Sequence, residues 1–140
     1  KPLFTDKESA LDPAAMVFAV WCARNLEWSE IMKRDKTTFG KVMKDSTAER
    51  GNRICARGSI AEIAVDRSAG PAIYHGGLVT PGRKNVRFAA GQDTGELVAR
   101  KPARFCGIVT GRYSYENSIG GTTHAVYAVG MFDLPKNRTP

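Results

Sequence analysis

The sequence lacks long apolar runs, clustered metal ligands and nucleotide-binding loops, and each absence excludes a class of function. Its longest apolar run, Ala14 to Ala23, is only about half of the roughly 20 residues that cross a bilayer, so we expect no transmembrane segment. The two histidines and three cysteines form no CxxC pair and no Cys/His cluster, which argues against structural zinc. Two Gly-Gly pairs lie outside any GxxxxGK[ST] or GxGxxG frame, so they predict turns and barrel curvature rather than a phosphate loop.

The overall composition is that of an ordinary globular protein. The 140 residues are 42% apolar and 25% charged, enough to bury a core without disulfides or metals. Neither a repeat nor a linker divides the chain. The sequence therefore predicts one domain over 1–140, with a helical N-terminal portion at 1–52, a β-barrel at 53–134 and a tail at 135–140.

Positive charge is concentrated in the second part of the chain. The net charge is +7. Residues 1–52 hold nine Lys/Arg against eight Asp/Glu, whereas residues 53–140 hold twelve against six. Such a surface favours nucleic acid, an anionic membrane face or an acidic partner protein, although the same bias is also found on soluble proteins without such partners.

Helical spacing characterises the N-terminal portion. Asp12 and Pro13 predict a helix start, and the helix should run to Arg24. Phe18, Trp21 and Cys22 recur at helical spacing, so this face is expected to pack on the core.

Shorter helices follow. Residues 25–36 either continue the first helix or break it once near Asn25. Thr37 or Thr38 predicts the cap of another short helix, and Ser46 to Glu49 has the form of a capping box, with Gly51 ending that turn.

From Arg53 onward the apolar residues alternate, which predicts β-strands. The first of these strands changes phase in its middle, which indicates a β-bulge at Gly58. The fold class is therefore α+β, with N-terminal helices followed by a small five-stranded antiparallel barrel. The expected strands are 53–65, 72–80, 85–90, 104–113 and 123–134, the last two forming a long hairpin.

Two stretches, Ile54 to Ile63 and Phe105 to Gly111, carry a strand-Gly-strand pattern. With five strands and a break between the third and fourth, the chain over about residues 53–134 resembles the OB-fold, the five-stranded barrel that binds oligonucleotides and oligosaccharides. The same strands would also fit an SH3-like barrel or a general five-stranded sheet. The 52 residues before the barrel have no counterpart in a minimal OB domain, and they would pack under the barrel or cover its usual binding face.

The three cysteines allow two interpretations. Cys22, Cys55 and Cys106 are either three buried thiols, or Cys55 and Cys106 form a disulfide between neighbouring strands, which would imply an oxidising compartment. No secretory signal is visible, yet the chain begins at Lys1 rather than Met, as a processed product would. The possible disulfide and the start at Lys1 together favour an extracytoplasmic location.

The sequence offers only weak candidates for catalytic residues or metal ligands. A cysteine hydrolase would pair Cys106 with His124 and Asp133, but no neighbouring group activates the thiol. His75 and His124 lack a carboxylate or cysteine at ligand spacing. We therefore expect a non-enzymatic protein with no catalytic residue, no metal and no cofactor.

Polyanion binding has more support among the residues of the predicted barrel. The resemblance to OB-folds implies a ligand site on strands two and three and the adjoining hairpin loops. There, cations would lie beside tyrosine rings, as single-stranded nucleic acid requires. The candidate binding residues are Tyr74, Arg83, Lys84, Arg87, Arg104, Arg112, Tyr113 and Tyr115.

Two functions thus remain. The first is a protein-interaction or structural module in an extracytoplasmic assembly, with the helical N-terminal portion as its partner surface. The alternative is single-stranded nucleic-acid binding through the basic face of the barrel.

Overall fold

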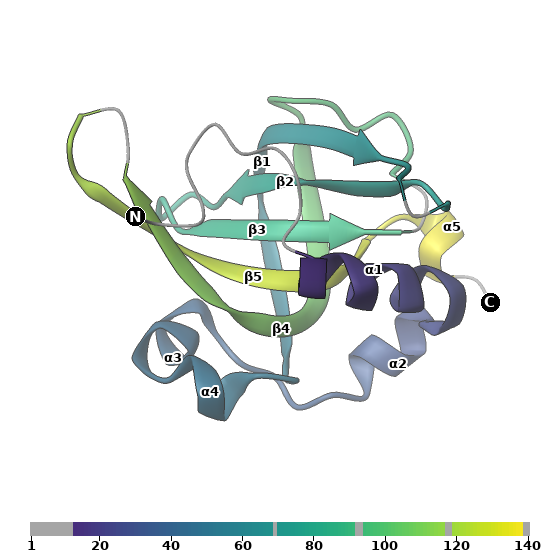
Figure 1. The fold of residues 1–140 in the computed structure, drawn as a ribbon, viewed down its shortest axis with the longest axis horizontal. Coiled ribbons are helices and arrows are strands. Elements are labelled where there is room, and N and C mark those ends of the chain that lie inside the picture. The colour runs from purple at the N-terminus through teal and green to yellow at the C-terminus, as the bar shows by residue number, and fades with distance from the viewer. Residues whose placement is uncertain (1–12, 69, 92–93, 117–118, 139–140) are drawn as a thin grey trace.

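The computed structural model describes residues 13–68, 70–91, 94–116 and 119–138, and their strands form a closed barrel. The strands are hydrogen-bonded in the order β1-β2-β3-β5-β4, and β4 returns to β1 (Figure 1). The strands are β1 (Arg53–Asp66), β2 (Ile73–Val79), β3 (Asn85–Ala90), β4 (Pro102–Glu116) and β5 (Thr122–Phe132).

The sheet is mixed, so the prediction of an all-antiparallel barrel was wrong. β3 and β5 run parallel, with Phe88 opposite Ala128, whereas the other four strand pairs are antiparallel. The reason is one of parity. Strand direction must alternate around an antiparallel ring, and five strands cannot alternate all the way round, so one pair has to be parallel.

Two apolar clusters lie on opposite faces of the sheet. The interior cluster centres on Phe88, Phe105 and Phe132, whose ring centroids lie 4.9 to 5.6 Å apart. The second cluster contains alternate residues of the same strands, such as Cys106 and Val129, packed against helical residues. Both faces are buried at residues 105–109 of β4 and 125–132 of β5, so these segments read as nearly continuous apolar runs.

Five helices accompany the barrel in the described part of the chain. α1 packs on β2, β3 and β5, whereas α3 and α4 contact β4 (Figure 1). No helix among the described residues has the length and hydrophobicity needed to span a bilayer. The helices are α1 (Pro13–Asn25), α2 (Trp28–Met32), α3 (Phe39–Lys44), α4 (Ser46–Glu49) and α5 (Pro135–Arg138).

The first helix ends at Asn25, and the face that it buries is narrower than predicted. Ala19 and Cys22 are buried, but the side chain of Trp21 is 52% exposed and stacks on Phe18. Trp21 therefore lies at the edge of the buried face. Asp12, the predicted N-cap, lies outside the described residues.

The N-terminal caps of α3 and α4 agree only partly with the prediction. Thr38 caps α3, where its hydroxyl accepts a hydrogen bond from the Lys41 amide. Asp45, rather than Ser46, caps α4, because its carboxylate accepts the Ala48 amide.

The bulge in β1 lies between Ile60 and Glu62 and not at Gly58. Glycine is needed at position 58 for another reason. A Cβ atom there would overlap the backbone carbonyl of Val79 on β2, so the close approach of two backbones, and not a bulge, accounts for this glycine.

Residues 135–138, predicted as part of a tail, are helical. Pro135–Arg138 forms the helical turn α5, and the buried Asn137 side chain donates a hydrogen bond of 2.8 Å to the Phe132 carbonyl. This bond holds the chain against the end of β5.

Candidate functional site

A cleft of about 510 Å³ lies where the α2–α3 connection meets β1, β4 and the turn between β2 and β3. Its volume is within the range of about 300–1,000 Å³ that is typical of ligand sites. Most of the lining is cationic or apolar. The lining residues are Met32, Lys36, Thr37, Thr38, Phe39, Arg53, Ile54, Cys55, Ala56, Arg57, Thr80, Lys84, Val86 and Arg104.

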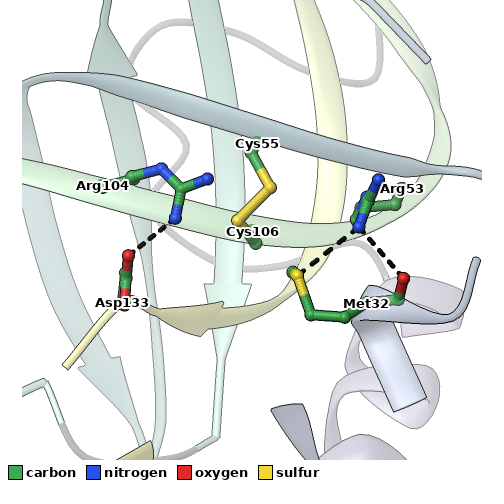
Figure 2. The surroundings of a disulfide bond; sticks show 6 residues. All are labelled: Met32, Arg53, Cys55, Arg104, Cys106 and Asp133. Atoms are coloured by element: carbon green, nitrogen blue, oxygen red, sulfur yellow. Dashed lines mark hydrogen bonds and ion pairs between the residues drawn. A yellow bond between two sulfur atoms is a disulfide. The ribbon is translucent and has the colours of Figure 1, made fainter. Parts of the chain in front are cut away.

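β1 supplies one wall. Arg53, Cys55 and Arg57 alternate along this strand and therefore point to the same face of the sheet. Cys55 forms a disulfide with Cys106 of β4 (Figure 2), which is the second of the two interpretations of the cysteines. The two cysteines are direct register partners with Cα atoms 4.1 Å apart. The disulfide therefore joins the two strands beside the cations.

The α2–α3 connection is held against the start of β1. The Arg53 amide donates to the Asp35 carbonyl at 2.7 Å, and the Thr37 amide donates to the Arg53 carbonyl at 2.8 Å. Thr37 is buried, and its hydroxyl donates to Glu49 at 2.6 Å. These bonds place Lys36 at the side of the cleft.

The turn between β2 and β3 forms the facing wall. Thr80 and Lys84 bond to each other twice, from the Thr80 amide to the Lys84 carbonyl at 3.0 Å and from the Lys84 amide to the Thr80 hydroxyl at 3.1 Å. The Lys84 ammonium lies 5.9 Å from the ring centroid of Phe39, at the start of α3. This cation–π contact links the turn to the helical portion.

Two arginines of the cleft are fixed by hydrogen bonds (Figure 2). Arg53 Nη1 donates to the Met32 carbonyl at 3.0 Å and to the Met32 sulfur at 3.4 Å. Arg104 Nη1 forms an ion pair of 2.6 Å with Asp133, whose side chain is only 7% exposed. The buried Nε of Arg53 makes no hydrogen bond within the described structure. A buried donor of this kind is costly unless a water molecule or a ligand accepts from it.

The electrostatic character of the cleft follows from its lining. Of the described residues, five cations line the cleft and no acidic residue does. Asp133, which does not line the cleft, forms an ion pair with one of these cations, Arg104. The arrangement favours anions, and the partly exposed apolar side chains of Met32 and Phe39 add a surface for an uncharged part of a ligand.

Of the predicted binding residues whose side chains the structure describes, two line the cleft, Lys84 and Arg104. Arg83 is exposed in the turn beside Lys84, with a φ of 62°. Arg87 forms an ion pair of 2.9 Å with Glu62 and is largely buried.

The remaining predicted residues lie elsewhere. Arg112 of β4 donates to the Met43 carbonyl in α3. Tyr74 lies on β2 opposite Val65 and Ala90. The side chains of Tyr113 and Tyr115 are outside the described part of the structure. A single face with cations and stacked tyrosines is therefore not assembled from the described members of this set.

Sequence reasoning missed Lys36, Arg53 and Arg57. The signal for the last two was present, because they alternate with Cys55 in a predicted strand and so had to share its face. Lys36 had no such signal, since its position depends on where the helix breaks and on the pairing of residues 35–37 with β1.

The cysteine-hydrolase arrangement is not assembled. Cys106 is fully buried in the disulfide. It lies opposite Met131, whereas His124 lies opposite Ser114, eight residues along β4. Eight residues of strand span roughly 26 Å. Asp133 pairs with Arg104 instead.

Two other titratable groups are buried away from the cleft. Burial raises the pKa of the Cys22 thiol to about 12, an effect that the charge of Arg34 opposes. Burial and then the positive charge of Arg87 lower the pKa of His75 below its usual value. The described residues contain no group of three or more side chains suited to holding a metal ion.

Comparison with known proteins identifies no family. No model of a known protein family matches the chain, and a search of curated proteins finds no significant similarity.

Proposed function

We propose that the chain is a non-enzymatic protein-interaction module that holds an acidic segment of a partner protein in the basic cleft. The observation that carries this proposal is the lining itself: among the described residues it has five cations, no acid and the partly exposed apolar side chains of Met32 and Phe39, around a volume of about 510 Å³. An extended acidic segment supplies both carboxylates and apolar side chains, so it complements both parts of this lining.

A protein segment fits the cleft better than single-stranded nucleic acid. Nucleic-acid sites combine cations with aromatic rings on which successive bases stack. Phe39 is the single aromatic ring among the described residues of the lining, and it already contacts Lys84. Nucleic-acid binding is the second candidate, because twelve of the 21 Lys/Arg residues lie in or after the barrel.

We also propose that the barrel is of the OB type. The closed order β1-β2-β3-β5-β4 with a parallel β3–β5 pair supports this assignment. OB-folds bind ligands on the face of strands two and three, but here α1 packs against β2 and β3. The cleft lies instead between β1 and the β2–β3 turn, a different position from the usual OB site.

We also propose that the protein resides in an oxidising, extracytoplasmic compartment. The support for this location is the Cys55–Cys106 disulfide, since such bonds persist mainly in secreted and periplasmic proteins.

The test is a titration of a labelled peptide that alternates Glu and Leu, at low and near-physiological salt. Arg57→Ala combined with Lys84→Ala should lower the affinity at least about tenfold. Each charge-assisted hydrogen bond contributes about 1.5–3 kcal/mol, and about 1.4 kcal/mol corresponds to a factor of ten. Arg104 is left unchanged so that its pairing with the buried Asp133 is preserved.

The matched control is Arg67→Ala with Lys101→Ala, which removes the same charge from two exposed residues outside the cleft. If both double variants weaken binding equally, attraction to overall charge and not the cleft explains the binding. A mixed-sequence single-stranded oligonucleotide is titrated in parallel. Binding of the oligonucleotide alone, with sensitivity to the cleft variant, would replace the acidic segment with nucleic acid.

A further inference from the structure

Two arginines of the cleft face each other directly across neighbouring strands. Arg57 of β1 is the register partner of Arg104 of β4, two residues from the Cys55–Cys106 pair. The Cα separation of 4.1 Å at the cysteines is typical of a non-hydrogen-bonded antiparallel pair, in which side chains lie closest. This pair type recurs every second residue, so Arg57 and Arg104 also form a close pair.

Like charges placed opposite each other destabilise a sheet. Here Asp133 forms an ion pair with Arg104 through Nη1, while Arg57 is exposed. Figure 2 shows the other terminal nitrogen of Arg104 directed away from Asp133. A guanidinium has five N–H donors, so this ion pair fixes Arg104 and leaves it donors for a ligand.

From these contacts we propose that Arg57 and Arg104 form a paired-guanidinium site that holds one carboxylate of the bound acidic segment, and that the Cys55–Cys106 disulfide positions the pair. This inference rests on the proposed function of the cleft. A carboxylate has two oxygens that accept from a planar guanidinium in fixed geometry, and one placed between the two side chains removes their repulsion. The disulfide is the covalent link that keeps β1 and β4 in register at this point.

The first test keeps every charge in place. Arg57→Lys retains the positive charge but loses the planar fork, and the two side chains are not interchangeable at such a site. We expect the affinity for the Glu/Leu peptide to fall at least about fivefold while the slope of affinity against salt stays the same, because the slope follows the number of charges. Arg67→Lys, an exposed position outside the cleft, should leave the affinity unchanged.

The outcome separates this inference from the proposed function. If Arg57→Lys binds like the parent while Arg57→Ala/Lys84→Ala binds weakly, the cleft holds its ligand by charge alone and the paired site is wrong. If the oxidised parent does not bind the peptide at all, the proposed function fails, and the paired site fails with it.

The second test concerns the disulfide. Dithiothreitol transfers two electrons and two protons to the Cys55–Cys106 bond, giving two protein thiols and the cyclic disulfide of the reagent. The reduced protein should bind the peptide at least about fivefold more weakly, within the usual range of coupling between two sites. Equal affinity of the two forms would show that the disulfide does not position the pair.

A reciprocal measurement covers the case in which the reduced protein unfolds. Linkage requires the ligand to favour the oxidised form by the same factor by which oxidation favours the ligand. The reduced fraction of the protein is measured in a series of buffers, each with a set ratio of reduced to oxidised dithiothreitol. Saturating peptide should raise the ratio at which half of the protein is reduced at least about fivefold. In the Arg57→Lys variant the increase should be smaller than in the parent. An increase of the same size in both would overturn the role of the paired arginines.

Discussion

The disulfide between β1 and β4 should contribute a large part of the stability of the barrel. Cys55 and Cys106 are 51 residues apart in sequence, and cross-linking a loop of this length removes chain entropy from the unfolded state. The loop-closure relation gives about 4 kcal/mol at 25 °C. For a domain of this size that corresponds to roughly 12 °C in melting temperature.

The assay compares the free energy of unfolding of the oxidised and the reduced protein by chemical denaturation. Reduction changes only the covalent link and leaves the side chains in place, so the difference measures the cross-link. As a control, Cys55→Ala/Cys106→Ala should show the same stability with and without reductant. A difference of less than about 1 kcal/mol between oxidised and reduced parent would refute the reasoning.

Three further results follow from packing and burial. Gly58→Ala should lower the free energy of unfolding by about 2–3 kcal/mol, because its Cβ would overlap the backbone of Val79. Gly40→Ala, which has open space around it in α3, should instead be neutral or stabilising. Equal effects of the two substitutions would contradict the role given to Gly58. The pKa of His75 is lowered from 6.5, so on acidification below about pH 6.5 the unfolded chain takes up a proton that the folded protein does not. The free energy of unfolding should therefore decrease below about pH 6.5, and the decrease should be smaller in His75→Gln. The Cys22 thiol, with a pKa of about 12, should not react with Ellman's reagent at pH 8 in the native protein and should react after denaturation; rapid native reaction would show that it is accessible.

The strands of the barrel were predictable because alternation is a local signal. β3 was predicted at its observed bounds, and β1 to within a residue. The parallel β3–β5 pair was not predictable in this way, since it arises from closing an odd number of strands into a ring. The role of Gly58 was misjudged for a similar reason: the carbonyl that excludes a side chain belongs to Val79, which is distant in sequence.

The candidate site was less accessible to sequence reasoning than the fold. Its walls come from four separate parts of the chain, so no local pattern contains it. Lys84 and Arg104 were chosen for their charge, but Arg87, chosen on the same ground, pairs with Glu62. A count of cations along the sequence does not show which of them are already paired within the fold.

The central claim, that the basic cleft binds an acidic segment, is tested most directly by mapping the bound peptide. Backbone amide shifts of isotope-labelled protein would be followed by NMR during titration with the Glu/Leu peptide. Our account predicts saturable shifts concentrated at residues 36–39, 53–57, 80–86 and 104. Shifts concentrated instead around the exposed Val17 and Trp21 of α1, or no saturable shift at all, would contradict it.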